Sequence, residues 1–550
     1  MKMKKRFTAA TLLMSAALVL SGCSTGSNSK NSSGETSNLK SLNFVAQQEL
    51  PTADLSLATD TISFTVLNNV YEGLYRQDKD DKLVPAGASQ KAEVSSDGLT
   101  YKVKLREDAK WSNGDPVTAK DYVYSWQRTV SPETASQYAY LFAPVENAED
   151  ITAGKKNKNE LGIKATSDYD LEIKLSQATP YFERLLAFPS FFPQNQAVAE
   201  KFGKDYTTKS DNAVYNGPFK LEGFDGPGTD TTWTYAKNDQ YWDKSNVKID
   251  KIDVNVVKES ATSLNLFNSN QADDIVLTGE LAQQNRNISQ FKAVADARTS
   301  YLEYNQRDAN SKFKNENLRK AIGYSIDRTA LTNSILGDGS QPATGLVPKG
   351  TMTGPDGKDF ADVASAGISY DASKAKEYWN KAKQELGISS LDFSILSSDS
   401  DSSKKVLEYL QNTIQSNLDG VKVSLNPVPF SVRLDRSKAG NFDLVLGGWG
   451  ADYLDASSFT DLFVTGNSYN RGQWSNSEYD NLIKASKTTD VNDVNKRFED
   501  LVNADKLLSN TQGMTPLYQG VEAHMISSRV KNFVSHPAGA KFDYKWLEVE

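Results

Sequence analysis

The chain has a single cysteine, Cys23, among its 550 residues. No disulfide can form within such a chain, so any fold that it adopts must be held together by buried apolar side chains. The length exceeds what one hydrophobic core usually serves. We therefore expect two or three domains without covalent cross-links.

The segment before Cys23 indicates how that cysteine is used. Lys2, Lys4, Lys5 and Arg6 precede an apolar run over 8–20 that is too short to span a bilayer, which is typical of a signal peptide. Leu20-Ser21-Gly22-Cys23 resembles a lipobox, the bacterial lipoprotein signal. The resemblance implies a signal peptide over 1–22 and a diacylglyceryl group on the sulfur of Cys23. An ordinary signal peptide with an incidental cysteine is the alternative.

The residues after Cys23 are almost all Ser, Thr, Asn and Gly. Such a composition predicts a flexible tether, which we place with the lipidated cysteine at 23–40. No later segment of the sequence is apolar enough to cross a bilayer, so we expect a body held at the extracytoplasmic face of the cell membrane by lipid alone. The net charge of −8 disfavours nucleic acid as a ligand.

The body of the chain mixes strand and helix patterns. Alternating apolar residues predict strands at 99–105, 171–175 and 252–256. A capping box at Thr118 and Asp121 predicts the start of a helix that ends at Ser131-Pro132. Further helices are expected at 318–326 and at 372–387. This mixture predicts an α/β fold with mixed sheets.

Several kinds of chemistry are missing from the sequence. Only two histidines occur, His524 and His536, and no nucleophile, phosphate-binding or metalloprotease motif is found. Asp78, Asp80 and Asp81 lack the spacing of a calcium loop. We therefore expect no catalytic residue, no metal and no cofactor. Glycoside hydrolysis needs only two carboxylates, so a lipid-anchored glycan-active hydrolase remains the alternative function.

Six blocks of sequence carry a family resemblance. In chain order they are Asn69–Tyr75 (NVYEGLY), Trp111–Asp121 (WSNGDPVTAKD) with Tyr124–Arg128 (YSWQR), Tyr215–Leu221 (YNGPFKL), Asn238–Asp243 (NDQYWD), Leu318–Ile322 (LRKAI) with Ile326–Arg328 (IDR), and Phe442–Leu446 (FDLVL) with Gly448–Tyr453 (GWGADY). Together they resemble the family 5 extracellular solute-binding proteins, which are the oligopeptide, dipeptide and nickel binders of ABC importers. The resemblance implies that the first block, Asn69–Tyr75, belongs to an early helix. The scarcity of histidine favours the oligopeptide-binding branch.

The resemblance implies a periplasmic-binding-protein-like α/β fold with three lobes around a closing cleft. Domain I would comprise 41–71, 196–297 and 520–550, domain II would be an insertion at 72–195, and domain III would be a second α/β lobe at 298–519. The implied function is the substrate-binding component of an oligopeptide ABC importer. It would not be an enzyme, and it would act as a monomer that delivers peptides to permease subunits in the membrane.

A protein that binds many peptides must recognise what peptides share, namely backbone amides and charged termini. A desolvated ammonium group needs a carboxylate partner, and the family motif assigns that role to Asp452. A helix cap or a surface aspartate is the alternative. Gly447, Gly448 and Gly450 predict a tight loop around Trp449 where a ligand backbone approaches.

The remaining candidates come from the same resemblance. Trp449 would form a wall of the first side-chain pocket, with an ordinary core tryptophan as the alternative. Asp60 and Thr61 would offer backbone groups, with a buried strand as the alternative. Tyr138 and Tyr301 correspond to tyrosines in the clefts of relatives, with ordinary packing as the alternative. Some relatives carry arginines just before the last motif that help to hold the peptide C-terminus. Leu446 stands at that position in this chain, and Arg433 and Arg436 lie nearby without a clear correspondence.

Overall fold

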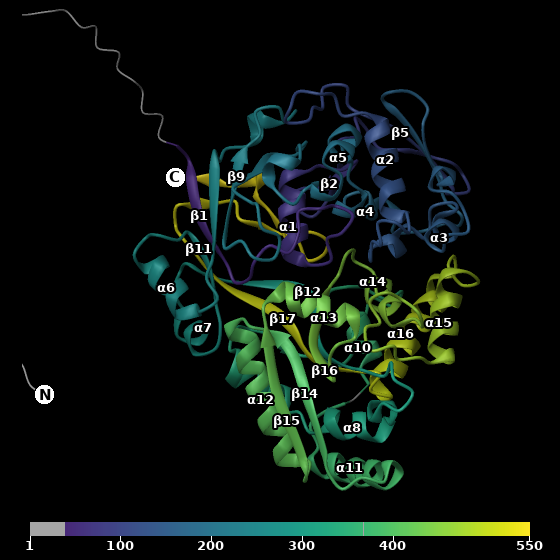
Figure 1. The fold of residues 1–550 in the computed structure, drawn as a ribbon, viewed down its shortest axis with the longest axis vertical. Coiled ribbons are helices and arrows are strands. Elements are labelled where there is room, and N and C mark those ends of the chain that lie inside the picture. The colour runs from purple at the N-terminus through teal and green to yellow at the C-terminus, as the bar shows by residue number, and fades with distance from the viewer. Residues whose placement is uncertain (1–38, 367) are drawn as a thin grey trace, which may run out of the picture. The chain divides into compact units, whose positions relative to one another are not determined.

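The computed structural model describes residues 39–366 and 368–550 of the chain (Figure 1). The predicted signal peptide, Cys23 and nearly all of the predicted tether lie outside the described residues. Lys40–Glu550 form one compact unit. None of the helices in the described part of the chain combines the length and hydrophobicity needed to cross a lipid bilayer.

The largest element of the described chain is an eleven-stranded sheet. Its strands are β1 (Ser41–Ala46), β8 (Phe219–Glu222), β9 (Thr232–Lys237), β10 (Lys251–Val256), β11 (Asp274–Leu277), β12 (Phe291–Tyr304), β13 (Gln341–Pro342), β14 (Leu391–Ser398), β15 (Val421–Val428), β16 (Leu444–Gly450) and β17 (Met514–Ile526). They lie in the order β15-β14-β16-β12-β17-β11-β1-β10-β9-β8, and β13 pairs with β17 outside this path.

The sheet is mixed, as predicted. The β1–β10, β1–β11, β14–β15 and β14–β16 pairs are parallel, whereas the β12–β16 and β12–β17 pairs are antiparallel. The predicted strand at 252–256 is β10, in which Ile252 and Val254 are buried. Its alternating pattern places these apolar side chains on the core side of the sheet.

Strands β12 and β17 are unusually long and run side by side (Figure 1). Their pairing shifts register between Ala295 and Thr299 and again at Tyr301. The predicted boundaries between domains I and III, at 297/298 and 519/520, fall inside these two strands. The predicted passage from one lobe to the other would therefore follow two paired strands. The boundaries of the three lobes stay a prediction.

A smaller antiparallel sheet has the strand order β4-β5-β7-β6. The short strands outside the large sheet are β2 (Tyr75–Gln77), β3 (Leu83–Pro85), β4 (Glu93–Val94), β5 (Thr100–Lys104), β6 (Ile163–Ala165), β7 (Asp170–Lys174), β18 (Val530–Lys531), β19 (Val534–Ser535), β20 (Phe542–Asp543) and β21 (Glu548–Val549). The predicted strands at 99–105 and 171–175 are confirmed as β5 and β7. The small sheet lies within the predicted domain II and shares no strand with the large one among the described residues.

The three helices that the sequence predicted, near 118–131, 318–326 and 372–387, are present among the helices of the described chain. Those helices are α1 (Thr61–Val70), α2 (Ala119–Val130), α3 (Ala148–Thr152), α4 (Phe182–Leu185), α5 (Gln196–Phe202), α6 (Ser260–Asn268), α7 (Glu280–Asn285), α8 (Glu316–Tyr324), α9 (Arg328–Ala330), α10 (Phe360–Ala364), α11 (Ala372–Leu386), α12 (Asp401–Asn417), α13 (Phe430–Ala439), α14 (Ser457–Thr460), α15 (Ser477–Lys487) and α16 (Val494–Asn510). The Asp121 carboxylate accepts the backbone N–H of Thr118 at 2.8 Å, which completes the predicted capping box of α2. Helix α11 ends at Gly387, whose φ of +65° suits glycine.

One helical expectation is wrong. The family resemblance implied that the segment Asn69–Tyr75 is part of a helix, but α1 ends at Val70 and Glu72 follows in an irregular segment. The change of direction brings Glu72 into a buried charged network instead. Its carboxylate accepts the Tyr241 hydroxyl and the Trp242 indole N–H, each at 2.5 Å.

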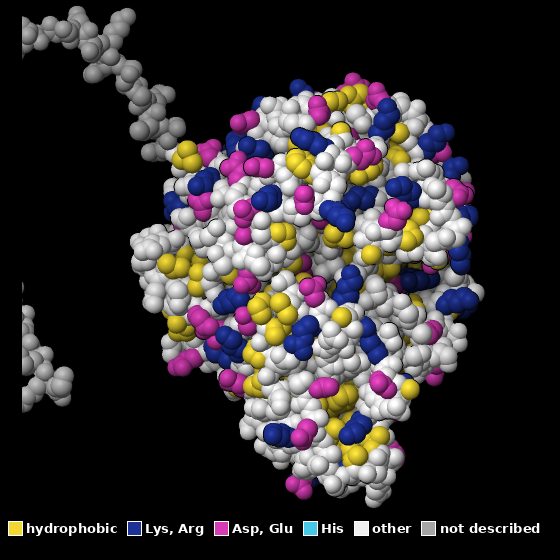
Figure 2. All heavy atoms as spheres, viewed as in Figure 1, with side chains coloured by type: hydrophobic (Ala, Val, Ile, Leu, Met, Phe, Trp, Pro, Cys, Tyr) yellow, Lys and Arg dark blue, Asp and Glu magenta, His cyan; other side chains and the backbone are white. Residues whose placement is uncertain are grey.

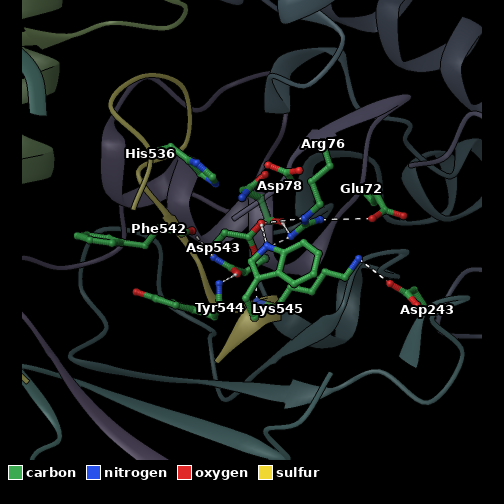
Figure 3. Close-up of polar contacts among 12 residues, drawn as sticks. Glu72, Arg76, Asp78, Asp243, His536, Phe542, Asp543, Tyr544 and Lys545 are labelled. Atoms are coloured by element: carbon green, nitrogen blue, oxygen red, sulfur yellow. Dashed lines mark hydrogen bonds and ion pairs between the residues drawn. The ribbon is translucent and has the colours of Figure 1, made fainter. Parts of the chain in front are cut away.

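This network ties the C-terminal residues to the segment after α1 (Figure 3). Arg76 donates two hydrogen bonds of 2.9 Å to the Asp543 carboxylate and a longer one to Glu72. Lys545 forms an ion pair with Asp243 at 2.7 Å. Two of the family motifs, those containing Glu72 and Asp243, therefore hold the body together in this protein.

The charged side chains at the surface are mixed. On the face drawn in Figure 2, lysines and arginines are interspersed with aspartates and glutamates, and neither sign covers a broad area. A surface of this kind offers no extended basic patch on that face for a phosphate backbone.

Candidate functional site

A cavity of about 410 Å³ is lined by residues from β12, β16, β17, α13 and the start of α1. It brings together all seven residues that the sequence predicted as ligand contacts. These residues are Asp60, Thr61, Tyr138, Tyr301, Trp449, Gly450 and Asp452. They come from all three predicted lobes, so the cavity lies where those lobes would meet. That they contact a ligand remains our proposal.

Asp452 is the most unusual carboxylate in the cavity. It is the second residue after β16 and is only 7% exposed. Its two oxygens accept hydrogen bonds from the hydroxyls of Tyr138, at 3.0 Å, and Tyr140, at 3.4 Å. Burial raises the pKa of Asp452 from its usual 3.8 to about 8, although the two phenols oppose the rise. Within the described residues no lysine or arginine forms an ion pair with it.

Aromatic rings surround this carboxylate. Tyr138 stacks on Trp449 with ring centroids 6.1 Å apart and an angle of 14° between the planes. Tyr469 meets Tyr138 edge-on at 5.4 Å and Trp449 edge-on at 4.5 Å. The indole Nε1 of Trp449 is buried and has no hydrogen-bond partner in the described protein. These rings form a largely apolar wall beside the carboxylate, in which the Trp449 Nε1 and the Tyr469 hydroxyl both lack a partner in the described chain.

The predicted glycine loop around Trp449 is wrong. Gly447, Gly448 and Gly450 lie within strand β16, which pairs with β12 along its whole length. A Cβ at Gly448 would stand 3.2 Å from Nη1 of Arg298, so this glycine makes room inside the strand, whereas a Cβ at Gly447 or Gly450 would make only ordinary contacts. The prediction mistook glycines that give room in a strand for glycines that turn the chain.

The other edge of β16 is only partly paired. Strand β14 pairs with it at Leu444 and Val445 alone. In the described chain no strand pairs with that edge from Leu446 to Gly450, and residues 446–450 line the cavity. Since alternate residues of a strand point their N–H and C=O groups to opposite sides, this stretch offers unpaired backbone groups to the cavity.

Asp60 and Thr61 stand at the start of α1. The Asp60 side chain caps the helix by accepting the backbone N–H of Ser63 at 2.8 Å, so the alternative of a buried strand at this point is wrong. The second carboxylate oxygen of Asp60 is buried without a partner. Burial raises the pKa of Asp60, which makes its charged form costly.

The structure adds three cavity arginines that the sequence did not single out as a set. Arg298 comes from β12, Arg433 from α13 and Arg471 from the loop before α15. Arg433, which the sequence left undecided, lines the cavity. Arg436 does not, and its guanidinium contacts the backbone oxygen of Asn441 instead.

A second cluster of charged side chains in the cavity is fully paired. The imidazole of His524 contacts Asp274 at 2.7 Å and Glu522 at 3.1 Å, and Lys541 reaches Glu522 at 2.8 Å. Burial alone would lower the pKa of His524, but the two acids raise it to about 9. These groups satisfy one another, in contrast to Asp452. No cluster of His, Cys, Asp or Glu suited to a metal ion occurs in residues 39–366 and 368–550.

Sequence reasoning missed several residues of the site. Tyr140 lies two positions after the predicted Tyr138, and Tyr469 and Arg471 lie in a polar loop. Arg298 gave no signal of its own, because the sequence of β12 also carries Lys292, Asp296 and Glu303. Their joint arrangement depends on contacts between segments far apart in the chain.

Comparison with known proteins places the chain in a family. The profile of the bacterial extracellular solute-binding proteins, family 5 Middle, matches residues 82–471. A dipeptide-binding protein of Lactococcus lactis subsp. cremoris is 37% identical over 99% of both chains. The structure of Listeria monocytogenes OppA bound to peptide is 41% identical, covers 93% of this chain and 99% of its own, and has a TM-score of 0.89.

A third relative agrees in fold and extent. The substrate-binding domain of an oligopeptide ABC transporter from Bacillus anthracis has a TM-score of 0.90 and 42% identity, covering 93% of this chain and 99% of its own. The chain belongs to the bacterial extracellular solute-binding proteins of family 5. The predicted family and the predicted multi-lobe α/β class are thereby confirmed.

Proposed function

We propose that this protein is the lipid-anchored substrate-binding component of an oligopeptide ABC importer, and that it binds intact peptides and delivers them to permease subunits. The observation that carries the proposal is Asp452. A carboxylate that is 7% exposed, has a pKa raised to about 8 and lacks a cationic partner in the described chain is poised for a positive ligand group. The free ammonium group of a peptide is such a group.

Backbone recognition follows from the open edge of β16. A peptide in extended conformation adds to this edge as a further strand, and the groups of residues 446–450 bind its amides. Such bonds do not depend on the peptide's side chains. The proposed contacts at Gly450 and at the start of α1, Asp60 and Thr61, belong to this recognition of shared groups.

Polar atoms left without partners support a ligand in the same cavity. Several residues that line the cavity have a buried polar atom without a hydrogen-bond partner in the described protein. These atoms include Asp60 Oδ2, Arg433 Nε and Trp449 Nε1. Leaving a buried polar group unpaired costs roughly 1–3 kcal/mol. A bound peptide and its water would satisfy them, with Tyr138 and Tyr301 completing the walls.

The relatives support the same function. The Listeria structure holds a peptide, and the Lactococcus protein is described as dipeptide-binding. None of the three relatives is described as a hydrolase, so the glycan-active alternative gains no support. We propose a binding protein without catalytic activity, which closes its lobes around the ligand by a hinge motion.

The anchor rests on the sequence. The lipobox-like Leu20-Ser21-Gly22-Cys23 supports lipidation of Cys23 and a place at the extracytoplasmic face of the cell membrane. In that position a tethered monomer presents captured peptides to the permease.

The direct test is native mass spectrometry of the purified protein, followed by identification of any ligand that leaves on denaturation. We expect peptides with free N-termini and varied sequences. Peptides and cell-wall glycans incubated with the protein should be recovered unchanged. Cleavage that persists after repeated purification, or a lack of binding by every peptide tried, would contradict the proposal.

A further inference from the structure

Lys258 pairs with carboxylates from two of the predicted lobes. It lies between β10 and α6, in predicted domain I. Its ammonium group donates to both carboxylate oxygens of Asp399, at 3.0 and 2.9 Å, and lies 2.8 Å from Oε1 of Glu49. Glu49 belongs to predicted domain I as well, whereas Asp399 lies between β14 and α12 in predicted domain III. One cation therefore bridges the border between these two lobes.

The three groups are partly withdrawn from solvent. The side chains of Glu49, Lys258 and Asp399 are 12%, 24% and 25% exposed. Burial alone would lower the pKa of Lys258, but its hydrogen bonds to Glu49 and Asp399 raise it, so the ammonium group stays charged. Salt screens an ion pair with this degree of burial less than one at the open surface, so its loss is felt more strongly.

Other polar contacts follow the same border. Lys404 of α12 reaches Glu259 at 3.4 Å. The hydroxyl of Thr278 donates to the carboxylate of Asp401 at 3.1 Å. Both contacts hold the start of α12 against predicted domain I, and α12 lies below α6 and α7 in the view of Figure 1. Both are longer than the contacts of Lys258, which makes the strongest pair of this group.

This border lies at the edge of the cavity. Residues 47–48, just before Glu49, line the cavity, and so does Ser398, just before Asp399. The chain itself passes between the two predicted lobes within β12 and β17, and none of the three charged residues belongs to those strands. A hinge motion about β12 and β17 that opened the cavity would separate Lys258 from Asp399 and leave it beside Glu49.

We propose that the ion pair between Lys258 and Asp399 is a latch, which forms when the lobes close on a peptide and sets the rate at which the peptide leaves. The inference rests on the proposed peptide-binding function. Glu49 keeps the ammonium group in position before closure, so that Asp399 meets a cation that is already in place. Neither Lys258 nor Asp399 lines the cavity. The latch therefore slows the release of peptides of any sequence to a similar extent and leaves the choice of peptide to the cavity.

The test measures how fast a radiolabelled peptide leaves the purified full chain. Tetraalanine and hexaalanine serve as probes, and an excess of unlabelled peptide prevents rebinding. Asp399→Ala removes the closing partner and leaves the pair between Lys258 and Glu49 intact, whereas Asp399→Asn removes the charge but keeps the shape. Lys258→Arg keeps the cation. The matched control is Lys251→Met, which breaks an ion pair of 2.9 Å to Asp253 within a single predicted lobe.

We expect both Asp399 variants to release both peptides roughly three- to tenfold faster than the wild type, because a partly exposed ion pair contributes less than a fully buried one. The association rate should change by less than about twofold, since closure follows the encounter. Lys258→Arg and Lys251→Met should release peptide at close to the wild-type rate. Added salt should speed release from the wild type and have little effect on Asp399→Ala.

Thermal unfolding separates a latch from an ion pair that is always present. Without peptide the latch is open, so ligand-free Asp399→Ala should unfold at the same temperature as the wild type. With tetraalanine, the rise in unfolding temperature should be smaller for the variant, because its affinity is lower. An unchanged release rate in both Asp399 variants, or an equal loss of thermal stability with and without peptide, would overturn the latch. Failure of both peptides to bind the wild type would instead contradict the proposed function.

Discussion

The hydroxyl of Tyr138 donates a hydrogen bond of 3.0 Å to Oδ1 of Asp452, a residue 314 positions away in the chain. Tyr138 belongs to the predicted domain II and Asp452 to the predicted domain III, so the bond joins two of the three predicted lobes. Tyr140 contacts the other carboxylate oxygen. The carboxylate is thus oriented by neutral donors, which fix its position without neutralising it.

The raised pKa of Asp452 predicts a pH-dependent affinity. Its carboxyl group, with a pKa of about 8, is largely protonated at pH 6 in the ligand-free protein, whereas an ammonium group needs the ionised form. Peptide affinity should therefore rise with pH between about 6 and 8, by up to roughly tenfold per pH unit. Above about 8 it should fall, because the peptide's own α-amino group loses its proton.

Titration calorimetry across this pH range measures the effect directly. Asp452→Asn should remove the rising limb and leave the fall above pH 8. An affinity that stays constant from pH 6 to 8 in the wild type would show that the carboxylate is already ionised or is not the partner.

The same group predicts how stability depends on pH without ligand. The folded-state pKa of Asp452 is raised above its unfolded value of 3.8, so the unfolded state loses this proton first as the pH rises. The contribution of Asp452 to the free energy of unfolding is fully present below pH 3.8. It is lost as the pH rises towards about 8, at about 1.4 kcal/mol per pH unit.

Urea unfolding of the wild type and Asp452→Asn at several pH values isolates this contribution. From pH 4 to pH 8 the free energy of unfolding of the wild type should fall relative to that of Asp452→Asn. A difference that is the same at both ends would mean that Asp452 ionises normally in the folded protein.

The open edge of β16 predicts selectivity for the peptide backbone. Peptides of one length with permuted sequences should bind within roughly tenfold of one another, or about 1.4 kcal/mol. Replacing a central amide by its N-methyl form removes a donor to the strand edge and should cost more than any such permutation. A wide spread among permuted sequences, combined with tolerance of N-methylation, would argue for recognition of particular side chains.

The sequence predicted those parts of the fold that have local causes. Alternation located β5, β7 and β10, and the pair Thr118 and Asp121 located the start of α2. These signals are short-range, since each depends on the spacing of neighbouring side chains. The order of strands in the large sheet depends on contacts between distant segments, and no local pattern contained it.

The candidate site likewise contains residues that the sequence predicted and residues that it did not. The family motif led to Asp452 and Trp449, and both line the cavity. The glycines around Trp449 were misassigned to a loop, because glycine gives room in a strand as well as freedom in a turn. Arg298 and Arg471 line the same cavity only because β12 and the loop before α15 meet in the fold, and no local pattern of the sequence contained that meeting.

The lipobox-like segment predicts that Cys23 anchors the protein. Cys23→Ser should leave the folded body intact and release it from the membrane, because the hydroxyl cannot replace the thiol that carries the lipid. Fractionation of cells with detection of the protein in membrane and soluble fractions measures this, and circular dichroism of the released protein checks its fold. A variant that stays in the membrane fraction like the wild type would exclude the lipid anchor.

The final prediction concerns direct contact between Asp452 and the peptide ammonium. Breaking one side of a charge pair in a site poor in water typically costs roughly 2–5 kcal/mol. Asp452→Asn keeps the shape of the side chain and removes its charge, so the loss of binding free energy should lie in that range. Acetylation of the peptide N-terminus should cost the wild type a similar amount.

If the two groups meet, acetylation should add little further loss in the variant, since that pair is already broken. Titration calorimetry of wild type and variant with free and acetylated peptide gives the coupling energy, and Tyr138→Phe, which keeps the charge, serves as the control that retains sensitivity to acetylation. Two full, additive losses would place the ammonium group at another part of the cavity.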